Sequence, residues 1–136
     1  MDAYELHPIG RVESVLVDRE SAPRQGDEGA PDAWLVFDAA FAPGLQDLAV
    51  GDEVILLTWL DRARRDELRT HPRGDIRRPP LGVFSTRSPD RPNPIGLHDV
   101  EIVEVDGPRM RVRNLEALDG TPILDIKPIL EPAADR

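Results

Sequence analysis

Proline is the residue that most constrains how this chain can fold. Fourteen of its 136 residues are proline, about twice the ~5% of average proteins. Because proline lacks a backbone donor and clashes with the preceding helical turn, this density works against long helices. The short apolar runs that remain, separated by turn residues, are typical of small β-barrels and sandwiches. We therefore expect a mainly β fold, a barrel or a sandwich, with long loops and one or two short helices.

The apolar runs predict six strands. These are Leu6–Val15, Ala33–Phe37, Glu53–Leu60, Val100–Val105, Arg109–Val112 and Pro122–Ile126. The third run is apolar and rich in β-formers, which indicates a strand buried on both faces. Alternation in the fourth run slips after Ile102, which indicates a bulge. Met110 and Val112 are predicted to face inward, and the turn Asp106-Gly107-Pro108 joins the fourth and fifth strands into a hairpin.

Helical signals are weak and confined to two places. Leu45–Val50 is expected to make one turn, and Asp61–Thr70 is the best candidate for a short helix. We expect Gln25–Asp32 to form a mobile loop and Glu131–Arg136 a flexible tail. The length of the chain predicts a single domain over residues 1–136.

Composition excludes several classes of protein. The chain has no cysteine, which excludes disulfides and thiolate metal sites. Its three histidines, His7, His71 and His98, lack ligand-like spacing, so no metal site is expected. No run approaches the ~20 apolar residues of a membrane helix, and the start of the chain has no signal-peptide pattern. We therefore expect a cytoplasmic protein.

Charge is distributed unevenly along the chain. The net charge of −9 argues against a protein that binds nucleic acid over its whole surface. Between Arg62 and Arg91, however, nine arginines and four acidic residues give a charge of +5 and leave −14 for the remainder. A basic face of this kind suits an anionic ligand or a docked piece of RNA. The alternative is a solvated, arginine-rich loop, and the charge pattern favours neither.

The most informative stretch is Gly82–Leu97, which contains the run TRSPDRPNPIGL. Three of its residues precede a proline, which pushes their backbones toward extended conformations. The result is a stiff, non-helical loop that presents Arg87, Arg91 and Asn93 in fixed directions at little cost in entropy. Such preorganisation is typical of a binding site.

This run resembles the signature of the TrmO (TsaA-like) family of S-adenosylmethionine-dependent tRNA methyltransferases. Other segments match the family in the same order: Ile9-Gly10, Pro23-Arg24-Gln25, Thr58-Trp59-Leu60, Asp119-Gly120-Thr121-Pro122 and Leu124-Asp125-Ile126-Lys127-Pro128. The resemblance covers Tyr4 to Leu130. It implies a small β-barrel that acts as a homodimer and uses S-adenosylmethionine to methylate the exocyclic nitrogen of threonylcarbamoyladenosine beside the tRNA anticodon.

The resemblance also implies which residues contact the cofactor. They are Pro23, Arg24, Gln25, Leu60, Asp61, Arg87, Leu97, Asp119, Gly120, Thr121 and Pro122. Leu60 and Leu97 would pack against the adenine, and Arg87 would pair with the cofactor carboxylate. The Asp-Gly-Thr-Pro turn would expose backbone donors and acceptors. Arg91 and Asn93 are the expected substrate contacts, with the Arg62–Arg91 segment meeting the anionic groups of the tRNA.

The chain departs from the family pattern in two respects. The family usually has a histidine where this chain has Asp61. A side-chain contact with the cofactor would make the exchange alter the local charge, whereas a backbone contact would not. In addition, the resemblance is to a short form without the C-terminal domain that tRNA-acting members carry.

The acceptor and the catalytic base stay open at this point. Asp61 and Asp90 are the carboxylates nearest the signature, and His98, expected at the surface at a strand start, is a third candidate base. None of the three is selected. Two further functions compete with tRNA methylation: methylation of a small anionic metabolite, and non-catalytic binding of S-adenosylmethionine that is relayed to a protein partner.

Overall fold

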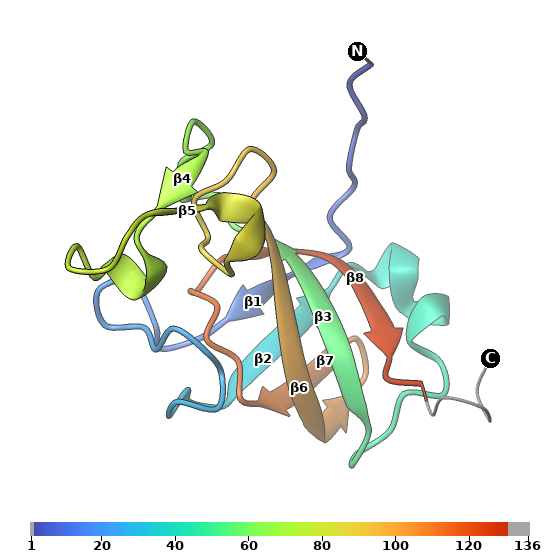
Figure 1. Ribbon diagram of the computed structural model, residues 1–136. Coiled ribbons are helices and arrows are strands. Elements are labelled where there is room, and N and C mark those ends of the chain that lie inside the picture. Colours follow the sequence, from blue (N-terminus) through green and yellow to red (C-terminus); the bar gives the residue numbers. More distant parts are fainter. Residues whose placement is uncertain (1, 131–136) are drawn as a thin grey trace.

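Six strands close into an antiparallel barrel with the order β1-β2-β7-β6-β3-β8. The structure is a computed structural model that describes residues 2–130 (Figure 1). The barrel strands are β1 (Gly10–Glu13), β2 (Ala33–Phe37), β3 (Glu53–Trp59), β6 (Ile95–Asp106), β7 (Arg109–Arg113) and β8 (Pro122–Pro128). The predicted mainly β fold and small antiparallel barrel are thus confirmed.

Alternate residues of each strand point into the barrel and fill it. On β3 the inward residues are Val54, Leu56 and Thr58, each no more than 1% exposed. Ile55 and Leu57 face outward and are half-buried, so the prediction that this strand is buried on both faces is wrong. A barrel of one layer has its core on the inner side alone. The other core side chains are Val12, Ala33, Leu35, Phe37, Val100, Ile102, Met110, Val112, Leu115, Ala117 and Ile123.

Strands β6 and β7 form the predicted hairpin. The register shifts between Ile102 and Glu104, which confirms the bulge, and Met110 and Val112 face inward as predicted. Gly107 in the turn has φ of 58°, a conformation that glycine adopts without strain. Strand β6 begins at Ile95, five residues before its predicted start, so the end of the signature run is itself part of the barrel.

The first strand is shorter at both ends than the predicted Leu6–Val15. Pro8 has no N–H for a ladder, and the chain before it stays outside the sheet with Tyr4 and Leu6 exposed. At the other end, the Ser14 amide donates to the Asp119 carboxylate at 3.0 Å instead of to a neighbouring strand. Only Gly10–Glu13 therefore pairs with β2.

The helices are three short 3₁₀ segments, η1 (Ala39–Leu45), η2 (Pro72–Gly74) and η3 (Val83–Ser85). The helical turn predicted at Leu45–Val50 is wrong, because the helix begins earlier, where the Asp38 carboxylate caps the Ala40 amide at 3.0 Å. The helix predicted over Asp61–Thr70 is wrong as well. This segment has no apolar stripe to pack on the barrel, and short helices depend on such packing.

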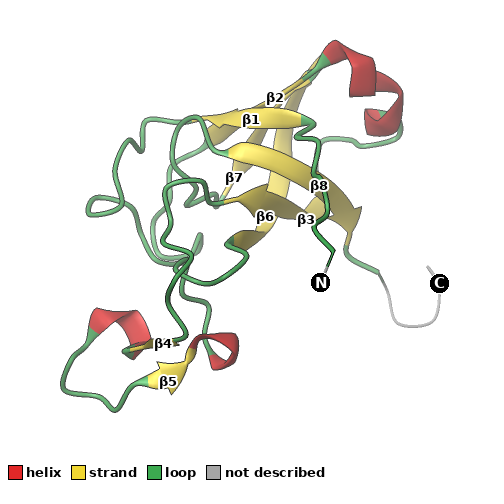
Figure 2. Ribbon diagram, turned by 90° about the horizontal axis from the view of Figure 1, so that it is seen from above, coloured by secondary structure: helices red, strands yellow, loops and turns green. Residues whose placement is uncertain are grey.

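Residues 61–94 form a lobe that projects from the barrel (Figure 2). The lobe contains a two-stranded sheet of β4 (Arg69–Thr70) and β5 (Leu81–Gly82). Its base is closed where the Leu60 amide donates to the Pro94 carbonyl at 2.8 Å. Residues 25–32 lie outside helices and strands, and their mobility stays a prediction; the predicted tail at 131–136 lies outside the described residues. Within residues 2–130, no helix is long and apolar enough to cross a bilayer.

Candidate functional site

Several of the predicted cofactor contacts gather at one rim of the barrel. There β3 ends, while β6 and β8 begin. Thr58 of β3 lies opposite Gly96 of β6 on one side and opposite Ile123 of β8 on the other. Leu97 on β6 and Pro122 on β8 therefore flank the end of β3, which Leu60 follows directly, although the three residues are far apart in the sequence.

Strand β6 has an unpaired edge at this rim. Strand β7 pairs with β6 from Glu101 to Asp106 and does not reach the residues before Glu101. The bond from the Leu60 amide to the Pro94 carbonyl sets the alternation along β6, so the backbone groups of Leu97 and Asp99 point away from β3. This edge is where an extended or planar hydrogen-bonding ligand would find backbone donors and acceptors.

A cavity of about 280 Å³ lies along the unpaired edge. It brings together Gln25, Arg87 and Leu97, three of the predicted cofactor contacts. The Arg87 guanidinium reaches the Leu97 carbonyl at 3.4 Å, a long bond that leaves its other donors for a ligand. The remaining lining residues are Gly26, Asp27, Glu53, His98, Asp99, Val100, Glu101, Asn114 and Glu116.

The other predicted contacts do not line this cavity. Asp119 and Gly120 border a separate depression of about 480 Å³ together with Arg11 and Trp34. Arg62 connects the lobe to the segments beside this depression, since its guanidinium donates to the Val17 carbonyl at 2.7 Å and to the Asp119 carbonyl at 3.5 Å. Apart from Leu60 and Pro122 at the rim, four predicted contacts remain: Arg24 and Asp61 are exposed, Pro23 is half-buried and Thr121 is buried. In a single chain, the predicted cofactor contacts are therefore split between the cavity beside β6 and the separate depression.

The backbone N–H groups of the Asp119–Pro122 turn are already hydrogen-bonded within the protein. The amides of Asp119, Gly120 and Thr121 donate to carbonyls of Leu16, Val12 and Leu118 at 2.7, 2.7 and 3.1 Å. The expectation that this turn offers free backbone donors is therefore wrong. The turn is fixed against β1 and the following loop, and Gly120, with φ of 83°, gives it the required conformation.

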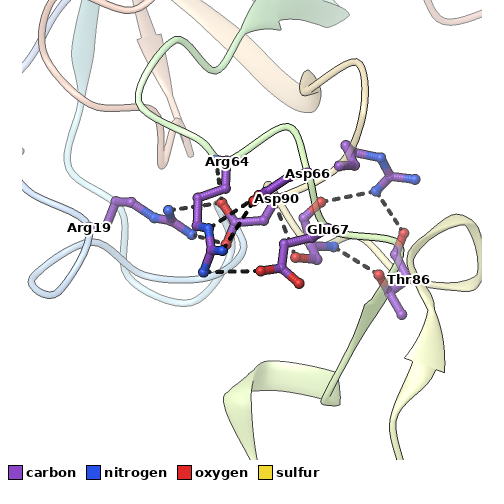
Figure 3. A network of polar contacts seen from close by, with 8 residues as sticks. Arg19, Arg64, Asp66, Glu67, Thr86 and Asp90 are labelled. Atoms are coloured by element: carbon purple, nitrogen blue, oxygen red, sulfur yellow. Dashed lines mark hydrogen bonds and ion pairs between the residues drawn. The ribbon is translucent and has the colours of Figure 1, made fainter.

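Asp90 holds the signature loop in place (Figure 3). Its carboxylate accepts two bonds of 3.0 Å from Arg19 and one of 2.8 Å from the Arg64 amide. Burial by itself raises the pKa of Asp90, but the hydrogen bonds from Arg19 and Arg64 outweigh it and hold the pKa below the ordinary aspartate value. A carboxylate so engaged is a poor proton acceptor, which removes Asp90 from the candidate bases.

Arg91 folds back on its own loop. Its guanidinium donates to the carbonyls of Thr86 and Ser88, both at 3.0 Å, and lies 6.0 Å from the Phe84 ring centre. Asn93 is exposed and accepts a bond of 3.3 Å from Arg65. Asn93 thus faces outward, whereas Arg91 stabilises the loop; their contact with a substrate stays a prediction.

Most arginines of the lobe form no ion pair with a carboxylate among the described residues. Within residues 2–130, ion pairs with carboxylates involve three of its nine arginines: Arg64 with Glu67, Arg73 with Glu28, and Arg77 with Asp75. Others, such as Arg65 and Arg69, donate to neutral oxygens. A guanidinium bonded to a carbonyl retains its charge, so the lobe is a basic surface on an acidic barrel.

Three polar residues at the rim were not predicted as a group. His98 is 4% exposed, so its expected surface position is wrong. Its Nε2 lies 2.7 Å from Thr58 Oγ1, and its Nδ1 lies 2.7 Å from Glu116 Oε1. The alternation of β6, if extended back from Val100 by two residues, would have placed His98 inward.

Comparison with known proteins gives a consistent result. Residues 11–135 match the family model described as the tRNA-methyltransferase O N-terminal domain. An S-adenosyl-L-methionine-binding protein of Archaeoglobus fulgidus is 48% identical over 123 residues, which are 90% of this chain and 86% of the relative. A probable S-adenosyl-L-methionine-binding protein of Methanothermobacter thermautotrophicus is 41% identical over 93% of this chain and 90% of its own length.

Solved structures agree in fold. Two crystal structures of TrmO from Pseudomonas aeruginosa superpose with TM-scores of 0.77 and 0.75 at 31% and 29% identity. They cover 100% and 99% of this chain, whereas the chain spans 58% and 61% of theirs. A second Archaeoglobus fulgidus relative, 44% identical, is also longer, and the chain spans 34% of it.

Proposed function

The chain belongs to the tRNA-methyltransferase O N-terminal domain family, and from this premise we propose that it methylates threonylcarbamoyladenosine beside the tRNA anticodon, with S-adenosylmethionine as donor. The names of its relatives support the cofactor, since they are proteins that bind S-adenosylmethionine. The observation that carries the proposal is the cavity that joins Gln25, Arg87 and Leu97 beside the unpaired edge of β6. We propose that residues 1–136 form a single domain. Because the proposed acceptor is tRNA, we expect the protein to act in the cytoplasm.

The cavity fits S-adenosylmethionine chemically. Arg87 has donors free for the carboxylate of the methionine part. Leu97 offers an apolar side chain, 44% exposed, for one face of the adenine. The backbone groups of Leu97 and Asp99 on the open edge suit the hydrogen-bonding edge of the base. Asp99, Glu101 and Glu53 in the lining favour the positive charge of the sulfonium and the ammonium.

When bound, S-adenosylmethionine would supply an electrophilic methyl group to the acceptor nitrogen; S-adenosylhomocysteine would leave, and the proton of the nitrogen would pass to solvent. The residues of the cavity act by alignment, because holding donor and acceptor in line removes much of the barrier. The lobe contributes the attraction of phosphates through Arg65, Arg69 and the other arginines without carboxylate partners. We assign no residue as the base.

A homodimer would complete the site. The predicted contacts Asp119 and Gly120 border a different depression from Arg87 and Leu97. Large apolar side chains are also exposed on β6 and on the lobe, with Ile95 at 46% and Phe84 at 77%. A second copy would cover these side chains and bring its own rim to the cavity. Sedimentation velocity tests this, and a monomer at concentrations that support activity would contradict it.

Transfer of labelled methyl groups to tRNA tests the function. Bulk tRNA that contains threonylcarbamoyladenosine is incubated with the protein and labelled S-adenosylmethionine, and its nucleosides are separated by mass spectrometry. We expect label on threonylcarbamoyladenosine and none on tRNA that lacks this modification. Label in a small-molecule fraction alone would instead identify a metabolite acceptor. Tight cofactor binding without any transfer would identify a binding module.

A further inference from the structure

The side chains of Thr58, His98 and Glu116 form a hydrogen-bonded network at the wall of the cavity: His98 and Glu116 belong to its lining, and Thr58 is fully buried behind them. None of the three is among the contacts that the family resemblance implies. We propose that His98 is a positioning residue: its two hydrogen bonds fix the strands and loops that carry the cofactor contacts. This inference rests on the proposed function, since it concerns the affinity of the same cavity for S-adenosylmethionine.

The network connects three separate segments of the rim. His98 lies on β6 directly after Leu97, and its Nε2 is 2.7 Å from Thr58 Oγ1 on β3. Its Nδ1 is 2.7 Å from Glu116 Oε1, on the segment that leads from β7 to the Asp119 turn. One imidazole therefore sets the spacing between Leu97, the end of β3 and the turn before β8.

Gly96 of the signature makes room for this network. A Cβ at this position would meet Thr58 Oγ1 and would lie 2.6 Å from His98 Nε2. The Thr58–His98 bond thus passes where a side chain of residue 96 would lie. The glycine belongs to the same arrangement as the histidine, which links the signature run to the buried network.

Glu116 extends the network to the loop that carries Gln25. Its second oxygen, Oε2, is buried and has no hydrogen-bond partner among the residues that the structure describes. Gly26 packs against it so closely that a Cβ there would lie 3.0 Å from Oε2 and would collide with the Asn114 carbonyl. Each segment that contributes to the cavity therefore touches Thr58, His98 or Glu116, or a residue beside them.

The role can be tested as positional at Thr58, the residue of the network that does not line the cavity. Thr58 has no exposed surface and His98 is 4% exposed. A substitution of Thr58 can therefore lower the affinity for S-adenosylmethionine only by changing the positions of other groups. Hydrogen bonds between such outer groups and the residues that contact a ligand commonly change affinity by about tenfold or more.

Calorimetric titration of S-adenosylmethionine into the full chain tests the proposal. Thr58→Val keeps the shape of the side chain and removes the hydroxyl, whereas Thr58→Ser keeps the hydroxyl. We expect the Kd to rise roughly tenfold in Thr58→Val and to stay within about threefold of wild type in Thr58→Ser. Thr58→Ala, which also removes the hydroxyl and changes no residue of the cavity lining, is expected to raise the Kd as well and serves if Thr58→Val does not fold.

Ile102→Val is the matched control. It lies on the same strand, faces the core and lowers stability without touching the network, so its Kd is expected to equal that of wild type. Wild-type affinity in Thr58→Val, or an equal loss in Ile102→Val, would overturn the inference and leave the proposed function intact. A wild-type chain that does not bind S-adenosylmethionine would overturn both.

Discussion

Gly96 has no room for a side chain, because Thr58 and His98 meet beside its α-carbon. We predict that Gly96→Ala lowers the free energy of unfolding by about 1–3 kcal/mol, the usual cost of forcing a methyl group into a filled space. The measurement is urea unfolding at neutral pH. The same variant is expected to weaken cofactor binding, because the methyl group separates Thr58 from His98.

Gly82 is the matched control for this substitution. A Cβ there would have nothing within 4 Å, and its φ of −58° is ordinary for any residue. Gly82→Ala reduces the freedom of the unfolded chain as much as Gly96→Ala does, so the difference between them isolates the steric cost. Equal stability of the two variants would show that the Thr58–His98 contact is not tight.

The sequence indicated which residues were candidates for the site better than it indicated what each of them does. The prolines predicted a stiff loop, which stays a prediction, and they gave no sign that Arg91 folds back onto Thr86 and Ser88. His98 was missed because the predicted strand began at Val100, which hid its inward position. No local sequence pattern predicts the contact between Glu116 and His98, because the two residues come together only in the closed barrel.

Among the elements, the signature loop depends on the ion pair between Asp90 and Arg19. We predict that Asp90→Asn lowers the free energy of unfolding by about 1–2 kcal/mol at pH 7, where the carboxylate is charged. Because the folded-state pKa of Asp90 is depressed, this stabilisation is present above the ordinary aspartate pKa, about 3.9. It is lost as the pH falls through the lower folded-state value.

Chemical unfolding of wild type and Asp90→Asn between pH 7 and pH 3 checks this dependence. The difference between the two proteins should shrink at the acid end of the range. Asp66→Asn is the control, because the Asp66 side chain is 75% exposed and its pair with Arg64 is a surface contact. A difference for Asp90→Asn that is independent of pH would show that its charge does not hold the loop.

Element boundaries were predicted well where one face of a strand is buried. Ala33–Phe37 matches β2 residue for residue, since its alternating pattern is the pattern of burial in the barrel. Asp61–Thr70 was misjudged as a helix because local propensity decided the prediction. In the structure its course depends on side-chain bonds to distant backbone groups, such as Arg65 to the Pro92 carbonyl, which no local pattern reveals.

The molecule as a whole separates an acidic barrel from a basic lobe. Proline content and apolar runs predicted a mainly β barrel or sandwich, and the family resemblance selected the barrel. The charge asymmetry was visible in the sequence as a window of +5 in a chain of −9. The cavity was not visible, because it exists where β7 stops short of the first half of β6. The lengths of the strands around a barrel depend on how the barrel closes. Local sequence patterns do not encode this closure.

Binding of S-adenosylmethionine to this cavity is the central claim, and titration calorimetry of wild type, Arg87→Leu and Arg78→Leu measures it. Arg78 is the control, because it belongs to the same lobe and does not line the cavity. We predict saturable binding by wild type, a Kd raised roughly 10- to 100-fold in Arg87→Leu through loss of the carboxylate pair, and an unchanged Kd in Arg78→Leu. Equal affinity of wild type and Arg87→Leu, or no binding by wild type, would contradict it.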